Sequence, residues 1–184
     1  MAENICTVVV NDWVNDLYKH LVLDAPATAL TARPGQFFHL LCPAAGSDTP
    51  FLRRPMSVYR VDSANRRVEF LYKVIGAGTR GIATLAPGDR FDILGPIGTG
   101  FTLDPSWRHI VVLARGVGLA TLAPLADLAR HHDIGLSAIL SARSPGLVMS
   151  TDLFRSHGGE VITVTDSEGT SAVNNVEAML VRLI

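Results

Sequence analysis

An arginine and a small hydroxyl residue, Arg54 and Ser57, stand three positions apart in the strand-like segment Leu52–Tyr59. A guanidinium group binds phosphate oxygens through paired, charge-assisted hydrogen bonds, and a hydroxyl group can hydrogen-bond to the edge of a flat ring. Because side chains alternate along a strand, the two residues point to opposite faces unless the strand bends or bulges. The pair therefore suits a ligand with a pyrophosphate at one end and a hydrogen-bonding ring at the other, such as a flavin dinucleotide. The alternative is a solvated arginine at the start of a strand.

A glycine-containing turn lies further along the chain at Tyr72–Gly81, and a second glycine-rich segment follows at Gly95–Phe101. Gly76 and Gly78 remove side chains from the turn, and Thr79 is placed to cap a short helix. The start of such a helix presents free N–H groups and a partial positive charge, which favour a pyrophosphate. Most turns of this composition bind nothing, so the prediction depends on the order of the segments.

Together and in this order, the three segments resemble the ferredoxin-reductase superfamily of flavoproteins, and within it the electron-transfer subunit of bacterial dihydroorotate dehydrogenase. Members carry a Leu-Arg-Arg-Pro-(Ile/Met)-Ser strand, a Tyr-(Arg/Lys)-Val-x-Gly-x-Gly-Thr turn and a Gly-Pro-(Leu/Ile)-Gly-x-Gly-Phe segment. These stand here at Leu52–Ser57, Tyr72–Thr79 and Gly95–Phe101. The resemblance implies that FAD is bound by residues of the first two motifs, namely Arg54, Pro55, Met56, Ser57, Tyr72, Lys73, Val74, Gly78 and Thr79. Ser57 is the candidate catalytic residue, because its hydroxyl would polarise the edge of the flavin ring.

Short segments rich in Val, Ile, Leu, Phe and Tyr, each bounded by turn residues, fill the first hundred positions and predict strands. The expected strands are Cys6–Val10, Tyr18–Leu23, Gln36–Cys42, Met56–Val61, Val68–Ile75 and Arg90–Leu94. Several short strands with a single helix suggest a small antiparallel barrel. In the superfamily such a barrel binds the flavin, so we expect residues 1–103 to form an FAD-binding β-barrel domain.

After Pro105, predicted strands alternate with predicted helices. The expected strands are His109–Leu113, Gly135–Leu140 and Val161–Thr165, and the expected helices are Leu119–His131, Val148–Arg155 and Asn174–Leu183. This alternation predicts a parallel sheet with crossover connections, and therefore an α/β fold. The resemblance implies that residues 104–184 form an NAD(P)-binding α/β domain, and an incomplete one, because the family's domain continues to further strands.

Candidate nucleotide-binding residues follow each of these three strands. They are Gly116, Val117, Gly118, Arg143 and Asp166. The glycines open the first helix, where the pyrophosphate of a dinucleotide would rest, and Arg143 lies where superfamily members recognise the adenosine ribose. Two family glycines are replaced by Ala114 and Arg115, and the arginine would either fill the site or bind the phosphate itself. A solvated Arg143 and a simple turn at Asp166 are the alternatives.

The composition is that of an ordinary globular protein: 184 residues, 48% apolar and 18% charged, with a net charge of −1. Such a chain can hold one large or two small domains. No basic stripe predicts a nucleic-acid partner. The longest apolar stretch, Ile110–Leu128, is interrupted by Arg115 and Asp127, so no membrane insertion is expected. The N-terminus lacks the features of a signal peptide, and we expect a cytoplasmic protein.

Cys6 and Cys42 are the only cysteines, and they are expected to be free buried thiols. Two thiolates cannot hold an iron–sulfur cluster, which needs four ligands. We therefore expect no such cluster within this chain, although the resembling subunit carries one. No metal site is expected either, because the histidines at His131–Asp133 stand where a helix ends, a routine place for cationic side chains.

Two functions fit the sequence. In the first, the chain binds FAD, exchanges electrons with NAD(P)H and passes them to a partner protein. In the second, it is a degenerate reductase retained as a structural or regulatory subunit of a larger complex. A parallel sheet that stops at the third crossover has an unpaired edge, so we expect a partner or a further segment to cover the surface around Val161–Thr165 and Asn174–Ile184.

Overall fold

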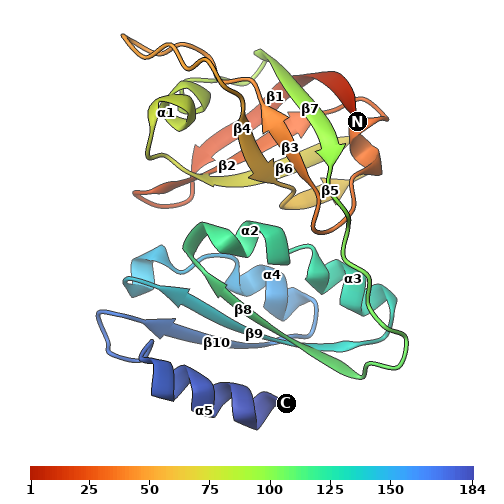
Figure 1. The fold of residues 1–184 in the computed structure, drawn as a ribbon, viewed down its shortest axis with the longest axis vertical. Coiled ribbons are helices and arrows are strands. Elements are labelled where there is room, and N and C mark those ends of the chain that lie inside the picture. The colour runs from red at the N-terminus through yellow and green to blue at the C-terminus, as the bar shows by residue number, and fades with distance from the viewer. The chain divides into compact units, whose positions relative to one another are not determined.

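The computed structural model describes residues 1–184, which divide into two compact units, Met1–Phe101 and Thr102–Ile184. Each unit has its own β-sheet (Figure 1). None of the helices combines the length and the apolar composition that crossing a bilayer requires.

The first unit is built on a seven-stranded antiparallel sheet that curls into a half-barrel (Figure 1). Its strands are β1 (Ala2–Trp13), β2 (Tyr18–Asp24), β3 (Phe37–Leu40), β4 (Arg54–Ser57), β5 (Arg60–Asp62), β6 (Arg67–Lys73) and β7 (Arg90–Ile97). They are ordered β4-β3-β7-β1-β2-β6-β5, and the unit also contains the 3-10 turn η1 (Ala29–Thr31) and the helix α1 (Ala77–Ala83). Pro55 lies in β4, an edge strand, where a residue without an N–H is tolerated.

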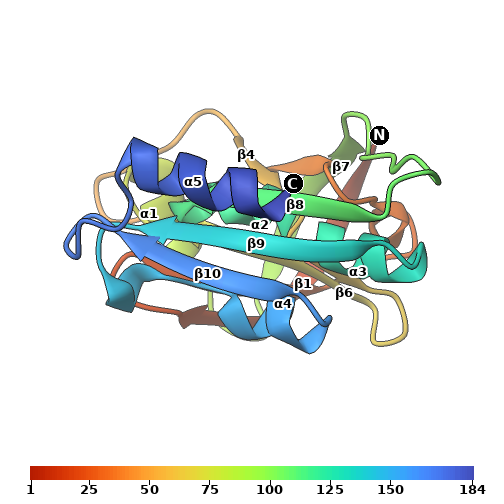
Figure 2. The same ribbon diagram turned by 90° about the horizontal axis from the view of Figure 1, so that it is seen from below.

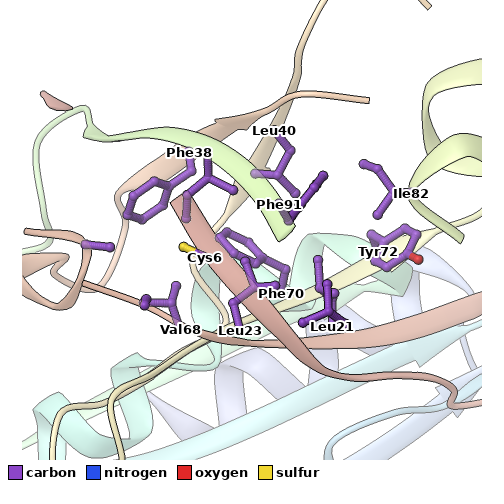
Figure 3. Close-up of a cluster of buried hydrophobic side chains, with 14 of the residues drawn as sticks. Cys6, Leu21, Leu23, Phe38, Leu40, Val68, Phe70, Tyr72, Ile82 and Phe91 are labelled. Carbon is purple, nitrogen blue, oxygen red and sulfur yellow. The ribbon is translucent and has the colours of Figure 1, made fainter. Parts of the chain in front are cut away.

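The core of the first unit is formed mainly by the inward-facing side chains of these strands, and Ile82 of α1 packs against them (Figure 3). Phe38 and Leu40 of β3 are fully buried, as are Val68 and Phe70 of β6. The rings of Phe38 and Phe70 meet edge to face, with their centroids 5.8 Å apart. Burial of each such side chain contributes about 1.5–3 kcal/mol. This core fixes β3 and β6, and through them the two segments that carry the predicted flavin-binding residues.

The second unit is built on a three-stranded parallel sheet in the order β10-β9-β8. Its strands are β8 (His109–Arg115), β9 (Gly135–Ala142) and β10 (Glu160–Thr165). Three helices lie on one face of this sheet, and α5 (Val173–Leu183) lies on the other (Figures 1 and 2). The three are α2 (Leu119–Leu122), α3 (Leu125–His131) and α4 (Thr151–Ser156), and the 3-10 turns are η2 (Gly116–Gly118) and η3 (Pro145–Leu147).

The predicted fold class, an antiparallel barrel followed by a parallel α/β sheet, is confirmed. Two predicted elements are each divided in the structure. The strand predicted at Met56–Val61 is β4 and β5, because the N–H of Val58 donates to the segment before β3 whereas that of Tyr59 donates to β6. The helix predicted at Leu119–His131 is α2 and α3, because Pro124 has no N–H to donate within a helix.

Candidate functional site

Arg54 and Gly78, which come from different predicted flavin segments, lie in contact in the first unit. A Cβ atom on Gly78 would lie 2.8 Å from Nε of Arg54, 2.9 Å from its Cγ and 3.0 Å from Sγ of Cys42. The arginine side chain therefore packs directly on the backbone of the first turn of α1, an approach that only glycine allows. The strand motif and the glycine-turn motif therefore lie next to each other in the fold.

The regular pairing of β3 with β4 sets the directions of the β4 side chains. Leu40 stands opposite Arg54 and Phe37 stands opposite Ser57, and no bulge interrupts this ladder. Arg54 and Met56 therefore share the face of the buried Leu40, whereas Ser57 points to the other face. A ligand that contacts both Arg54 and Ser57 must pass around this edge strand.

The two adjacent arginines have different surroundings. Arg53 donates two hydrogen bonds to the carboxylate of Asp92, at 3.0 and 2.7 Å, and its guanidinium lies 3.2 Å from Glu3. The hydrogen bonds from Arg53 lower the pKa of Asp92 and raise that of Arg53. Arg54 takes part in none of the ion pairs, and its Nη1 donates to the carbonyl of Leu52 at 2.6 Å. Arg54 is thus the arginine that can bind an anion without losing a carboxylate partner.

Tyr72, Lys73 and Val74 lie at the end of β6. The Tyr72 side chain is buried in the core, and its hydroxyl donates to Oδ1 of Asn11 at 2.9 Å. Burial raises the pKa of this hydroxyl. Lys73 and Val74 are half-buried, and the N–H of Val74 donates to the carbonyl of Leu17. A contact between Tyr72 and a flavin would have to use its backbone, so the role of these residues stays a prediction.

Thr79 caps helix α1 from within its first turn. Its hydroxyl oxygen accepts hydrogen bonds from the N–H groups of Ile75 and Gly76, at 2.9 and 3.0 Å. The residue before the helix is Gly76, which has no side chain that could cap it. The predicted cap by Thr79 is present, and it is made from the third residue of the helix back to the backbone N–H of Gly76. An ion pair of 2.8 Å between Arg80 and Asp48 ties α1 to the loop before β4. Both contacts hold the glycine turn beside Arg54.

The predicted nucleotide turn, Gly116, Val117 and Gly118, forms η2 directly after β8. Gly116 has a φ of +53°, which glycine adopts without strain, and a Cβ atom on Gly118 would meet nothing within 4 Å. The turn is therefore open enough for an anion. The helix that follows the turn is short, however, because Pro124 ends α2 after four residues. A short helix has fewer aligned peptide dipoles than the long helix that was predicted, so it attracts an anion at its N-terminus less strongly.

The ends of the three parallel strands are joined by Arg115. Its guanidinium donates to the carboxylate of Asp166 at 3.1 and 2.6 Å and to the hydroxyl of Ser141 at 2.8 Å. The hydrogen bonds from Arg115 and Ser171 lower the pKa of Asp166 to about 2. The sequence left open whether Arg115 fills the nucleotide site or binds phosphate, and in the structure it binds Asp166. Arg143 is exposed in the loop after β9 and takes part in no ion pair.

Three residues of these two clusters were not among the predicted site residues: Cys42, Ser141 and Ser171. Their contacts depend on tertiary structure, although the meeting of parallel strand ends at one sheet edge could have directed attention to Ser141. Cys6 and Cys42 are both free and buried, and burial raises the pKa of each thiol. The structure brings together no group of three or more histidine, cysteine, aspartate or glutamate side chains that could hold a metal ion.

No model of a protein family matches the chain, but curated relatives do. The electron transfer subunit of dihydroorotate dehydrogenase B (NAD(+)) from Desulforamulus reducens is 31% identical over 163 residues, which cover 89% of this chain and 62% of the relative. The subunit of the same name from Enterococcus faecalis is 32% identical over 180 residues, which cover 97% of this chain and 67% of the relative. The chain thus spans only part of the length of these relatives.

Solved structures share the fold. An NADH-dependent reduced ferredoxin-NADP oxidoreductase, studied for flavin-based electron bifurcation, superposes with a TM-score of 0.81 at 22% identity, covering 99% of this chain and 64% of that one. A cytochrome P450 reductase from Amycolatopsis gives a TM-score of 0.74 at 21% identity, covering 89% of this chain and 52% of that one. These likenesses support the barrel and parallel-sheet architecture described above.

Proposed function

Because the chain belongs to the family of dihydroorotate dehydrogenase electron transfer subunits, we propose that it binds FAD in its first unit and passes electrons between NAD(P)H and a partner protein. The observation that carries the proposal is the contact between Arg54 and Gly78, which joins two motifs more than twenty residues apart in sequence into one site. The space at Gly78 that a Cβ atom would fill is the space that the arginine needs, so the residues present fit a group with a pyrophosphate.

Within this site the residues would have separate tasks. Arg54 would bind phosphate oxygens, since a guanidinium matches their geometry and this one has no carboxylate partner. Ser57 would hydrogen-bond to the edge of the ring from the opposite face of β4, and Gly78 and Thr79 would line the turn. When bound, FAD supplies the redox chemistry, while the protein orients it and tunes it through hydrogen bonds.

The test is the affinity of the apo-protein for FAD, measured by the quenching of flavin fluorescence. Arg54→Ala removes a charge-assisted contact worth about 1.5–3 kcal/mol, so we expect FAD to bind about ten- to hundredfold more weakly. Arg90→Ala is the matched control, because Arg90 is an exposed strand arginine of the same unit that takes part in no ion pair. Unchanged affinity in Arg54→Ala would show that Arg54 does not hold the phosphate.

The nicotinamide nucleotide would use the second unit. Gly116, Val117 and Gly118 would face its pyrophosphate, with Arg143 near the adenosine ribose and Asp166 beside them. The open turn at Gly118 supports this assignment. The relatives are electron transfer subunits by name, which supports a catalytic oxidoreductase subunit as the protein partner. We infer a cytoplasmic location for this complex.

A second function is favoured by a specific observation in the second unit. The bidentate pair of Arg115 with Asp166 and the short helix α2 both weaken the predicted nucleotide site. A chain that retained the flavin site but lost the nucleotide site would serve as a structural or regulatory subunit. The visible spectrum of the purified protein, recorded before and after NADH or NADPH is added, separates the two functions, because a chain with a working nucleotide site loses the yellow flavin colour on reduction and a chain without that site stays yellow.

A further inference from the structure

Helix α1 is held at both ends by side chains of the half-barrel. Its first turn packs against Arg54 through Gly78. At and just beyond its other end, the carbonyl groups of Ile82, Ala83 and Leu85 accept side-chain hydrogen bonds from strands β1 and β2. A helix of seven residues is only about 10 Å long, so a shift at one end is passed to the other. The contacts at the far end therefore help to determine where Gly78 lies.

Asn11 of β1 supplies two of these contacts. Its buried amide donates from Nδ2 to the carbonyl of Ile82 at 2.9 Å and to that of Leu85 at 3.0 Å. Carbonyl groups accept but do not donate, so the amide must turn Nδ2 toward α1, and its Oδ1 accepts from the hydroxyl of Tyr72. Tyr72 and Ile82 lie at the same end of the core (Figure 3). One amide thus joins α1 to β1 and, through Tyr72, to β6.

Lys19 of β2 supplies the third contact. Its Nζ donates to the carbonyl of Ala83 at 3.0 Å and lies 5.3 Å from the centroid of the Trp13 ring. The residue is buried, and this burial lowers the pKa of Lys19. A buried ammonium group loses hydration, which polar contacts and aromatic faces must replace. The Ala83 carbonyl and the Trp13 ring do so here, and the charge of Lys19 is therefore directed at the end of α1.

These hydrogen bonds restrict α1 in a way that apolar packing does not. Ile82 is buried in the core, where apolar contacts are not directional. Hydrogen bonds depend on both distance and angle, so bonds to three successive carbonyl groups limit the rotation and the translation of the helix. Groups that bind a ligand must be held within about 0.5 Å of their productive positions. The three contacts hold in this way the turn against which Arg54 packs.

We propose that Asn11 and Lys19 are positioning residues of the flavin site, which fix the glycine turn of α1 and thereby the guanidinium of Arg54. This role rests on the proposed binding of FAD and adds residues of β1 and β2 to it. Neither residue belongs to the three motifs, and neither would touch the cofactor. Their effect on FAD would pass through Gly78 to Arg54, so it should be present only in a chain that has Arg54.

The experiment measures the FAD affinity of the full chain by flavin fluorescence in two backgrounds, the parent and Arg54→Ala. Asn11→Leu and Lys19→Met remove the contacts with side chains of similar size, and each should bind FAD about tenfold more weakly in the parent background. In the Arg54→Ala background the same substitutions should have no effect, because the group that they position is gone. A similar loss of affinity in both backgrounds would show general destabilisation and overturn the proposal.

Asn4→Leu is the matched control. Asn4 is also a buried asparagine of β1, and its Nδ2 also donates to backbone carbonyl groups, but these belong to Ala2, Ile93 and Gly95 and not to α1. Asn4→Leu should lower the Tm as Asn11→Leu does, and it should leave the FAD affinity unchanged in both backgrounds. An equal loss of FAD affinity in Asn4→Leu would mean that any buried contact of this unit matters, and the role of Asn11 would be wrong.

Thiol labelling tests the anchoring of α1 without FAD. Sγ of Cys42 lies 3.0 Å from the place that a Cβ of Gly78 would take, so this buried thiol lies against the first turn of α1, whereas the other buried thiol, Cys6, lies on β1. Asn11→Leu and Lys19→Met should raise the alkylation rate of Cys42 relative to Cys6 about tenfold, measured by mass spectrometry of the peptides.

The two measurements separate this role from the proposed function. If the parent chain binds FAD but neither variant changes the labelling of Cys42, the FAD site stands and the role of Asn11 and Lys19 fails. If the parent chain binds no FAD, the proposed function fails and with it the role at the flavin site. Faster labelling of Cys42 in both variants would then still show that the two residues hold α1.

Discussion

Gly78→Ala tests whether the glycine turn and Arg54 act as one flavin site. The added Cβ would lie 2.8 Å from Nε of Arg54 and 3.0 Å from Sγ of Cys42, whereas non-bonded heavy atoms are best separated by about 3.5–4.0 Å. The φ angle of Gly78 is not positive, so the backbone accepts alanine. The strain must therefore be relieved by the neighbouring side chains. We expect the Arg54 guanidinium to be displaced while the unit remains folded.

The size of the effect follows from the contact that is disturbed. A hydrogen bond to a charged group contributes about 1.5–3 kcal/mol, so complete loss of the Arg54 contact sets a limit of about ten- to hundredfold in FAD affinity. A displaced guanidinium keeps part of this interaction, and we expect Gly78→Ala to bind FAD about tenfold more weakly. The double variant Gly78→Ala/Arg54→Ala should bind like Arg54→Ala alone, because both substitutions remove the same contact.

Two neighbouring glycines provide the controls for this fluorescence titration. Gly76→Ala lies in the same turn, but a Cβ atom there would meet nothing within 4 Å, so FAD affinity should be unchanged. Gly81→Ala would place its Cβ against the backbone oxygen of Pro43, and this overpacking should lower the Tm. The reasoning is refuted if Gly78→Ala binds FAD as tightly as Gly76→Ala, or if the double variant binds much more weakly than Arg54→Ala.

Two further predictions concern the ion pairs. Arg53→Met leaves the half-buried Asp92 without its partner and should lower the free energy of unfolding, measured in urea titrations, by about 2 kcal/mol. Arg54→Ala should lower the free energy of unfolding much less, and equal losses would contradict the separate roles of the two arginines. The pKa of Asp166 is held at about 2, below its ordinary value of 3.8, so its pairing with Arg115 stabilises the fold fully above about pH 4 and is lost as the pH falls toward 2. Asp166→Asn should flatten this part of the pH dependence of unfolding, and an unchanged curve would argue against the pairing.

Apolar alternation was enough to predict the position of most strands. The strand predicted at Tyr18–Leu23 is observed at Tyr18–Asp24, and the one predicted at Val161–Thr165 is observed at Glu160–Thr165. β1 was predicted too short, at Cys6–Val10, because both of its ends are extended by pairing with β7 and β2 and not by an apolar run. Local patterns identify strands, but the partner strands decide where they end.

From the sequence, only the candidate site residues that belong to a recognisable motif could be predicted. The break at Pro124 had a signal in the sequence, since proline cannot donate within a helix. The separate environments of Arg53 and Arg54 had no such signal in the sequence, because only the register of β4 shows which of the two arginines forms an ion pair with Asp92. The partner of Arg115 lies 51 residues away and is likewise a product of the fold.

The ion pairs rank the two proposed anion sites of the chain. Arg53 binds the nearby carboxylates of the first unit, so Arg54 can contact phosphate without breaking an existing pair. Arg115 must first give up two hydrogen bonds to Asp166. A group that has no ion pair to break loses less on binding, so more of its interaction energy is measured as affinity. We therefore expect the proposed flavin site of the first unit to bind its ligand more tightly than the proposed nucleotide site of the second, whichever nicotinamide nucleotide is offered.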